Sequence, residues 1–269
     1  MGAKKGIAPY KMSLFVDVHC HLDLLLDIDS VIARASSAGL KVIIAAGVDP
    51  VSNRKVLELA ARFPLVKASL GLYPIDALVN EVATGEFHAH PIGFDIDEEI
   101  GFMRKNSAKI IAIGEAGLDY KTGKNKEEQR GLFEKQIELA KSLDKPIIVH
   151  SRKAEAECVE MLESSGIKKV LLHCFCGSKA LVKRAYSNGW YFSVPTNVVR
   201  SEQFQIMVKS VDISHLLTET DAPCLSPFKG QSNEPAFIVE AVKKIAELKG
   251  MDQTEAGNIV FMNYERLFL

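Results

Sequence analysis

Imidazole and carboxylate side chains recur at the ends of apolar runs in this sequence of 269 residues. Six of them stand out by type and position: His19, His21, Glu115, His150, His173 and Asp221. Nitrogen and oxygen ligands of these two kinds suit a divalent transition-metal ion. The pattern therefore predicts a site for a divalent metal ion.

The first two histidines of the set have a spacing that can bring both rings to one metal ion. His19 and His21 stand two residues apart, and on an extended segment this spacing puts both rings on the same side. His88 and His90 share the spacing but lie in an apparent loop, where we expect ordinary histidines. The first pair is distinguished by the other ligand-type residues that follow apolar runs.

Positioning these residues requires elements whose ends meet. Short β-branched runs alternate with amphipathic stretches, which predicts strands and helices in alternation. The expected strands cover residues 14–18, 42–46, 66–70, 110–113, 146–149, 170–172, 190–194 and 216–218. The expected helices cover residues 30–38, 50–62, 96–105, 127–143, 154–164, 179–188 and 202–209.

Eight such units favour a (β/α)8 TIM barrel, whose strands all end on the rim where active sites are built. A doubly wound open sheet is the competing architecture, but no G-x-G-x-x-G follows the first strand. We expect a single domain over residues 1–269, with barrel units over about 14–234 and helices over 235–269. Trp190 and Phe192 are expected in the core.

Composition excludes some classes of function. The net charge is −1, so a polyanion must be held by a local patch rather than by the field of the whole protein. No run reaches the roughly 20 apolar residues of a membrane span, and we read no secretory signal. None of the five cysteines forms a C-x-x-C pair, which favours free thiols and a cytoplasmic location. No obligate protein partner is indicated, and the oligomeric state is left open.

Several motifs together resemble a known family. They are D-V-H-C-H-L-D from Asp17, G-E-A-G-L-D-Y from Gly114, V-H-S-R from Val149, H-C-F-C-G from His173, T-E-T-D-A-P from Thr218 and N-E-P from Asn233. In this order they resemble the TatD-type metal-dependent hydrolases of the amidohydrolase superfamily. The resemblance implies a (β/α)8 barrel, a divalent metal centre and deoxyribonuclease activity, typically exonucleolytic.

The resemblance also implies a ligand set. One metal would be held by His19, His21, Glu115 and Asp221, and a second by Glu115, His150 and His173, with Glu115 as the bridging carboxylate. The cofactors are thus two divalent ions per chain, and Zn, Mn, Mg, Fe and Ni are not distinguished.

The carboxylates near these ligands invite separate roles. Asp221 and Glu115 are the two predicted catalytic residues. Asp221 is placed to take the proton of the attacking water, although it can alternatively serve only as a structural metal ligand. Glu219 and Asp23 can orient ligating imidazoles as hydrogen-bond acceptors. Asp23 can equally cap the segment that follows it.

Cations near the expected rim point to a substrate. Arg152 can clamp a phosphate, or it forms a surface ion pair. Lys121, Lys124 and Lys126 lie in one loop, where they either track a DNA backbone or are simply solvated. Lys229 and Arg200 can extend that track.

Tyr73 departs from the family pattern, because many relatives carry histidine at that position of a G-x-H-P segment. A tyrosine can donate a hydrogen bond to a phosphate but is a poor proton carrier near pH 7. We expect the metal centre to survive this change. Residues 80–95 are expected to form a loop over the rim.

Cysteines next to the expected ligands need a different interpretation. Cys20, Cys174 and Cys224 each lie within three residues of a ligand. A residue adjacent to a ligand in a strand points to the opposite side, so we expect these thiols to pack into the barrel wall.

The sequence is compatible with three functions. The leading hypothesis is a metal-dependent nuclease that cuts DNA, with single-stranded DNA favoured. The alternative is an amidohydrolase of small amides or esters, because the same metals polarise a carbonyl group. A scaffold without turnover is disfavoured, because it has no need of six ligand-type residues.

Overall fold

Eight parallel strands in sequential order form the centre of the structure, a computed structural model that describes residues 14–85 and 93–269. The strands are β1 (Phe15–Cys20), β2 (Leu40–Ala46), β3 (Val66–Leu70), β4 (Ile110–Asp119), β5 (Ile147–Arg152), β6 (Val170–Leu172), β7 (Tyr191–Pro195) and β8 (Leu216–Glu219). The sheet curls back on itself. The amide of Asp221, just after β8, donates to the carbonyl of His19 at 2.9 Å.

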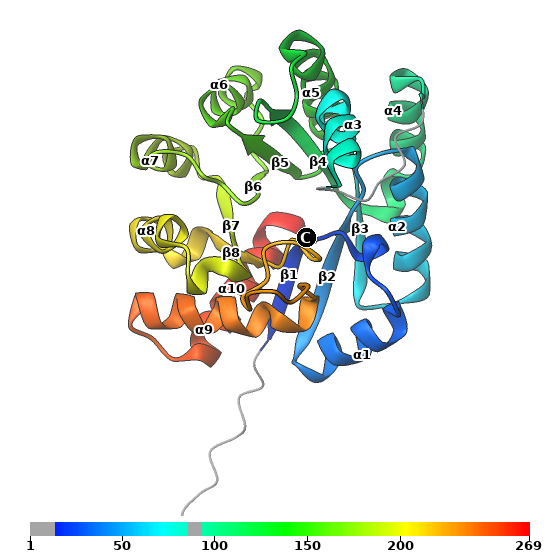
Figure 1. Ribbon diagram of the computed structural model, residues 1–269. Helices are drawn as coiled ribbons and strands as arrows, with labels where there is room; N and C mark the ends of the chain where they lie inside the picture. Colours follow the sequence, from blue (N-terminus) through cyan, green and yellow to red (C-terminus); the bar gives the residue numbers. More distant parts are fainter. Residues whose placement is uncertain (1–13, 86–92) are drawn as a thin grey trace, which may run out of the picture.

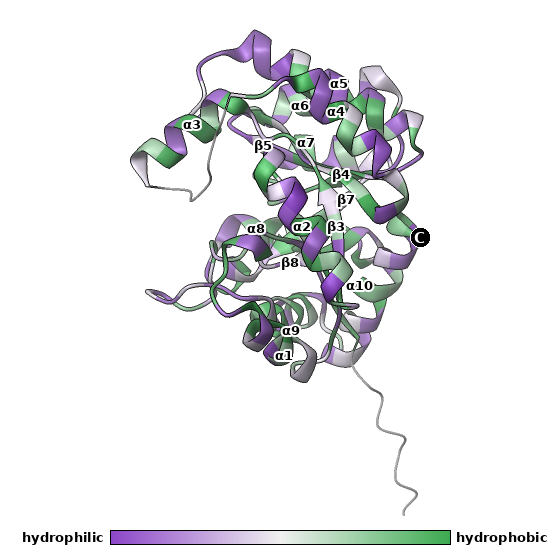
Figure 2. Ribbon diagram, turned by 90° about the vertical axis from the view of Figure 1, so that its right-hand side faces the viewer, coloured by the Kyte–Doolittle hydropathy of each residue, from purple (hydrophilic) through white to green (hydrophobic). Residues whose placement is uncertain are grey.

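Helices surround the strands, as Figure 1 shows. They are α1 (Ile28–Ser37), α2 (Pro50–Arg62), α3 (Ile75–Thr84), α4 (Ile96–Lys105), α5 (Lys126–Ser142), α6 (Glu155–Ser165), α7 (Lys179–Ser187), α8 (Glu202–Ser210), α9 (Ile238–Lys249) and α10 (Gln253–Phe268). In Figure 2, α3 and α5 alternate between hydrophilic and hydrophobic colours, as expected of helices with one buried face. The predicted (β/α)8 barrel is confirmed.

Among the described residues, two large apolar clusters fill most of the fold. The larger one lies between the strands and the surrounding helices. The smaller one fills the barrel interior with residues such as Val16, Ile44 and Leu217, and α10 adds Tyr264 and Phe268 to it. The last helix therefore closes one end of the barrel. Trp190 and Phe192 are buried in the larger cluster, as the sequence predicts.

Two departures from the predicted elements matter for the site. Strand β4 continues through Asp119, six residues beyond its predicted end, because Gly114 and Gly117 interrupt the apolar pattern without ending the strand. Helix α3 occupies part of the expected rim loop, so that prediction is wrong for residues 80–84. The remainder of that loop, including His88 and His90, lies largely outside the described residues.

Shifts in strand register turn the ligands toward the rim. The pairing of β1 with β2 shifts between Asp17 and Cys20, and the pairing of β4 with β5 shifts between Ile113 and Ala116. An extra residue in a strand reverses which side chains face the barrel. Val16 and Val18 face the barrel interior, and unbroken alternation would place Cys20 there too. Cys20 instead packs in the larger cluster between the strands and the helices.

Gly117 permits the close approach of β4 and β5. Its φ is 149°, and a Cβ atom there would lie 1.9 Å from the carbonyl oxygen of His150. We expect Gly117→Ala to lower the free energy of unfolding by about 3 kcal/mol or more, as overpacking in a tight interior does. Gly131→Ala is the matched control. It lies in α5 with open space around its Cβ position, so it should stabilise by about 1 kcal/mol. Urea unfolding of both variants checks this, and equal stabilities would contradict it.

Among residues 14–85 and 93–269, no helix is long and apolar enough to cross a bilayer.

Candidate metal centre

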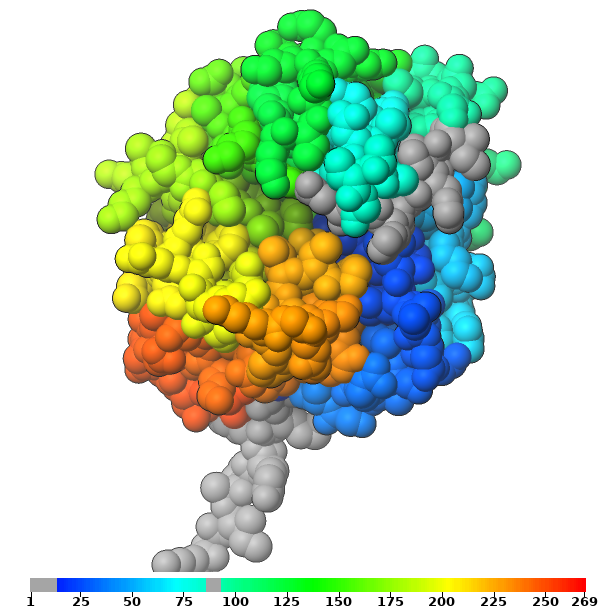
Figure 3. Space-filling model, in the orientation of Figure 1, coloured from blue at the N-terminus to red at the C-terminus, as the bar shows by residue number. Residues whose placement is uncertain are grey.

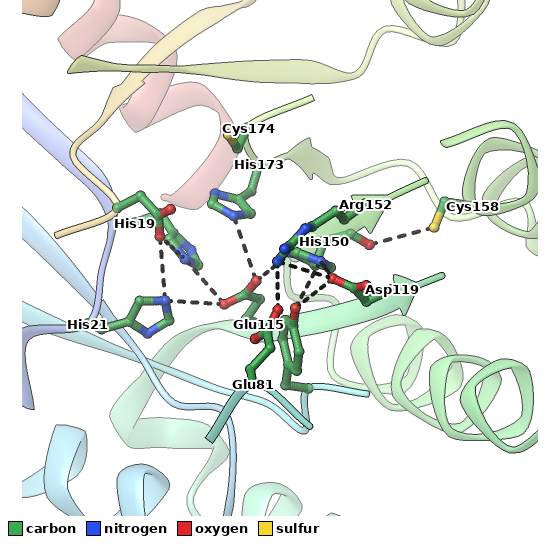
Figure 4. Close-up of polar contacts among 12 residues, drawn as sticks. His19, His21, Glu81, Glu115, Asp119, His150, Arg152, Cys158, His173 and Cys174 are labelled. Atoms are coloured by element: carbon green, nitrogen blue, oxygen red, sulfur yellow. Dashed lines mark hydrogen bonds and ion pairs between the residues drawn. The ribbon is translucent and has the colours of Figure 1, made fainter. Parts of the chain in front are cut away.

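The structure brings all six predicted ligand residues together at the carboxyl ends of the strands. His19 lies in β1 and His21 just after it, Glu115 lies in β4, and His150 lies in β5. His173 directly follows β6, and Asp221 follows β8 by two residues. Figure 4 shows five of these side chains pointing toward one another, and Figure 3 shows the face of the molecule on which the strands end.

Glu115 occupies the centre of the cluster. Its Oε1 lies 2.9 Å from Nδ1 of His150 and 3.7 Å from Nε2 of His173. Its Oε2 lies 3.3 Å from Nε2 of His19 and 3.5 Å from Nε2 of His21. Each carboxylate oxygen thus faces two imidazoles, as a ligand shared by two cations would.

Three overlapping groups have the arrangement of a cation site. They are His19, His21 and Glu115; His19, His173 and Asp221; and Glu115, His150 and His173. Within each group the ligand atoms lie within 4.8 Å of one another. Asp221 Oδ1 lies 3.5 Å from Nε2 of both His19 and His21.

His19 tests whether a metal fits this cluster. Its side chain is fully buried, yet neither ring nitrogen has a hydrogen-bond partner. Buried polar atoms are nearly always satisfied. Nε2 faces one oxygen of Glu115 at 3.3 Å and one of Asp221 at 3.5 Å without hydrogen-bond geometry, an arrangement that a cation between the three groups would complete. The residues present therefore fit a divalent metal.

Carboxylates also stand behind two of the imidazoles. Nδ1 of His173 lies 2.8 Å from Oε2 of Glu219, which accepts a second hydrogen bond from Ser193. Nε2 of His150 lies 3.0 Å from Oδ2 of Asp119. Such partners fix the tautomer and orientation of a ligating histidine. The sequence predicts an orienting acceptor at Glu219 and gives no such indication for Asp119.

Tyr73 joins the group around His150. Its hydroxyl donates to Oδ2 of Asp119 at 2.9 Å and lies 3.1 Å from Nε2 of His150. Asp119 also accepts from the amides of Lys121 and Thr122. The tyrosine therefore contacts the partner of a ligand, although its side chain also borders the cavity described next.

The cluster opens into a cavity of about 690 Å³, a typical size for a ligand site. Lys121, Arg152 and Lys153 line it together with all the ligand-type residues except the fully buried His19. Lys124, Lys126, Lys229 and Arg200 are not among its lining residues. Lys126 instead lies over the ring of Tyr120, 4.3 Å from its centroid, and Arg200 donates to the carbonyl of Ser226.

Two further residues, which the sequence does not predict for the site, lie beside the cationic side chains of the cavity. Glu81, from α3, accepts a hydrogen bond from Arg152 at 2.6 Å and is nearly buried. Lys153 has a φ of 60°, an uncommon conformation for a residue other than glycine, and such strain clusters at functional sites. No sequence signal marks Glu81; Lys153 follows directly after the V-H-S-R motif.

Other predicted neighbours behave differently. Asp23 is partly buried, but its Oδ1 has no hydrogen-bond partner, and no side chain caps the short helix that contains it. Cys20 packs in the core as expected. Cys174 and Cys224 line the cavity. The prediction that they pack into the barrel wall is therefore wrong for Cys224 and holds only in part for Cys174, which also contacts the larger apolar cluster. Both follow their strands, and the strand alternation no longer applies there.

Burial and charge oppose each other at the imidazoles. Burial lowers the pKa of His173, but Glu219 and Glu115 outweigh it and raise that pKa to about 10. By the same balance, the pKa of His21 rises to about 9 and that of His150 to about 8. Burial raises the pKa of Glu115, but the surrounding imidazoles hold it well below its usual range.

These shifts predict opposite pH responses for the protein with and without metal. The unfolded pKa of histidine is about 6.5, so in chelated protein the stability from these raised values is fully present below about 6.5 and is lost as pH rises toward 8–10. His19 opposes this trend, since its pKa is lowered mainly by burial. Metal binding needs neutral imidazoles, so it tightens over the same range.

We therefore expect the urea midpoint of chelated protein to fall between pH 6.5 and 9, while the gain on adding Zn²⁺ grows. Parallel urea titrations at several pH values measure both. A chelated protein that becomes more stable toward pH 9 would contradict the assigned direction.

Comparison with known proteins supports the same assignment. The family described as TatD related DNase matches residues 16–269. Human deoxyribonuclease TATDN3 is 34% identical over 262 residues, covering 94% of each chain. The metal-dependent hydrolase YabD of Bacillus subtilis is 32% identical, covering 95% of this chain and 99% of its own.

A solved structure agrees in fold. The crystal structure of YJJV, a TatD homologue from Escherichia coli, superposes with a TM-score of 0.80 at 27% identity and covers 94% of this chain and 97% of its own. The cluster of six ligand-type residues, the cavity beside it and these matches lead to one conclusion: the chain belongs to the TatD related DNase family and is a metal-dependent hydrolase.

Proposed function

We propose that the protein is a deoxyribonuclease that hydrolyses phosphodiester bonds of single-stranded DNA from a strand end, with two divalent ions. The observation that carries the proposal is one cavity that unites the metal-fitting cluster with Lys121, Arg152 and Lys153. Two bound divalent ions and these three cations would together outweigh the carboxylates of Glu81, Glu115, Glu155 and Asp221 in the same lining, which suits a phosphate backbone. The names of the relatives point to the same substrate.

The residues divide the work by position. Glu115, His150 and His173 would hold one ion, and His19, His21, Glu115 and Asp221 the other. When bound, the ions supply Lewis acidity and a water of lowered pKa. Asp221 reaches the cavity further than Glu115, with 16% of its side chain exposed against 3%. We assign to the Asp221 carboxylate the acceptance of the proton from the attacking water.

The remaining groups orient and bind. Glu219 and Asp119 hold the rings of His173 and His150. The Arg152 guanidinium is already paired with Glu81, so it arrives at the cavity in a fixed orientation. Lys121 and Lys153 add positive charge at the cavity wall, where a second phosphate of the strand would lie.

Position in one loop separates Lys121 from Lys124. Lys121 lines the cavity, whereas Lys124 does not. We expect Lys121→Ala to weaken binding of a single-stranded oligonucleotide and to reduce the slope of log K against log salt by about 0.7. Lys124→Ala should leave both unchanged. Fluorescence anisotropy across a salt series measures this. Equal effects of the two variants would mean that the whole loop contacts the DNA backbone and that the cavity position of Lys121 has no special role.

One assay tests the function itself. Single-stranded DNA, labelled at either end, is incubated with protein loaded with Zn²⁺, Mn²⁺ or Mg²⁺, with and without chelator, beside Asp221→Ala. We expect progressive shortening from one end that needs metal and Asp221. If DNA stays intact with every metal while simple amides or esters turn over, the protein is an amidohydrolase instead.

A further inference from the structure

The segment after β6 presents two thiols to the metal cavity. Cys174 and Cys176 both line it, and Phe175 between them is buried against the core, 5.8 Å from the ring of Phe192. The buried ring anchors the segment, so its two neighbours turn outward together. Cys174 has a φ of 44°, a strained conformation for a residue other than glycine.

The two thiols also differ in access and acidity. Cys176 is exposed, while Cys174 is partly exposed. The interaction with the Cys174 thiol lowers the pKa of Cys176, although burial opposes the change. Burial raises the pKa of Cys158 and of Cys224, the latter to about 12. Lowered pKa and access to solvent are what make a cysteine reactive.

The backbone of this pair is connected to a ligand. The amide of Cys174 donates to Oε1 of Glu219 at 2.9 Å, and Oε2 of the same carboxylate faces Nδ1 of His173 at 2.8 Å. At the other end, the carbonyl of Cys176 accepts from Gln203 of α8. A change in backbone conformation at Cys174 would therefore move the carboxylate that holds His173.

We propose that Cys174 and Cys176 form a modification site for hydroperoxides, in which their oxidation to a disulfide displaces Glu219 from His173 and weakens metal binding. Cys176 sulfur attacks the peroxide, forming an S–O bond as the O–O bond breaks, and water or an alcohol leaves. Cys174 sulfur then attacks the sulfenic sulfur, and the hydroxyl leaves with the thiol proton as water. Two thiols lose two electrons, and the peroxide is reduced.

The test uses the full chain, stripped of metal and treated with hydrogen peroxide. We expect the peptide that contains both cysteines to lose two hydrogens by mass, and dithiothreitol to restore it. Zn²⁺ added after removal of the peroxide should bind about 10–100-fold more weakly to oxidised than to reduced protein, the usual cost of losing a ligand's hydrogen-bond partner. Calorimetry gives that affinity without any assay of DNA cleavage, so a failed nuclease proposal leaves this test intact.

Two variants sharpen the outcome. Cys176→Ser should abolish both the mass loss and the fall in zinc affinity, whereas Cys224→Ser, on the same cavity, should abolish neither. A peptide that keeps its mass while other thiols oxidise, or a bond from Cys174 to Cys224, would overturn the site. A disulfide that leaves zinc affinity unchanged would overturn its link to His173.

Discussion

Glu115→Gln should lower turnover of a p-nitrophenyl phosphodiester by about 10³-fold or more and reduce the number of bound ions. Removing one member of a buried charged group costs about 3–5 kcal/mol, because the remaining buried charges are left without an opposite charge nearby. Here the lost charge faces four imidazoles, at 2.9 Å for His150 and 3.3 Å for His19. The amide keeps the shape of the side chain but replaces one acceptor oxygen by a donor that faces imidazole nitrogens.

Metal analysis after dialysis and a turnover assay at saturating metal check this result. Glu99→Gln is the matched control, since Glu99 is another carboxylate with 3% of its side chain exposed, paired with Arg54 and Asn53 away from the cavity. It should alter stability without changing the number of ions. If Glu115→Gln keeps the full number of ions and normal turnover, Glu115 is not shared between metals.

The convergence of the ligands could be predicted because it depends on topology alone. His150 and His173 stand at the ends of apolar runs, and a parallel barrel brings every such end to one rim. Glu115 differs from these histidines, because it does not stand at the end of its strand. It lies inside β4, and its direction depends on a register shift between Ile113 and Ala116 that alternation does not anticipate. The position was correct although the predicted strand was too short.

The missed residues share a physical cause. Asp119 is the last residue of β4, a strand whose apolar pattern is interrupted by glycines. The pattern therefore predicts a shorter strand and gives no indication that Asp119 is buried. Glu81 comes from α3, a helix part of which the sequence pattern predicts to be a loop. Cys174 and Cys224 follow their strands, where irregular backbone sets side-chain direction. Periodicity predicts directions within an element and is silent beyond its ends.

Asp221→Asn and Asp119→Asn should separate proton transfer from ligand positioning. Asp221 faces the cavity and lies 3.5 Å from Nε2 of His19 and His21. Loss of its carboxylate should reduce kcat by about 10²–10⁴-fold, the range for a general base, and leave the group of Glu115, His150 and His173 able to bind metal. Excess metal should not restore the rate.

Asp119 lies one contact further from the reaction, because it acts on His150 at 3.0 Å and on the Tyr73 hydroxyl at 2.9 Å. Its amide variant should bind metal about 10–100-fold more weakly and regain most of its turnover when metal is raised. Titrating kcat against metal concentration for both variants gives the comparison. Rescue of Asp221→Asn by metal would make Asp221 only a ligand, and the proton would then have to leave through another group. The carboxylate of Asp221 is more exposed to the cavity than that of Glu115, so the geometry favours the outcome in which metal does not restore the rate of Asp221→Asn.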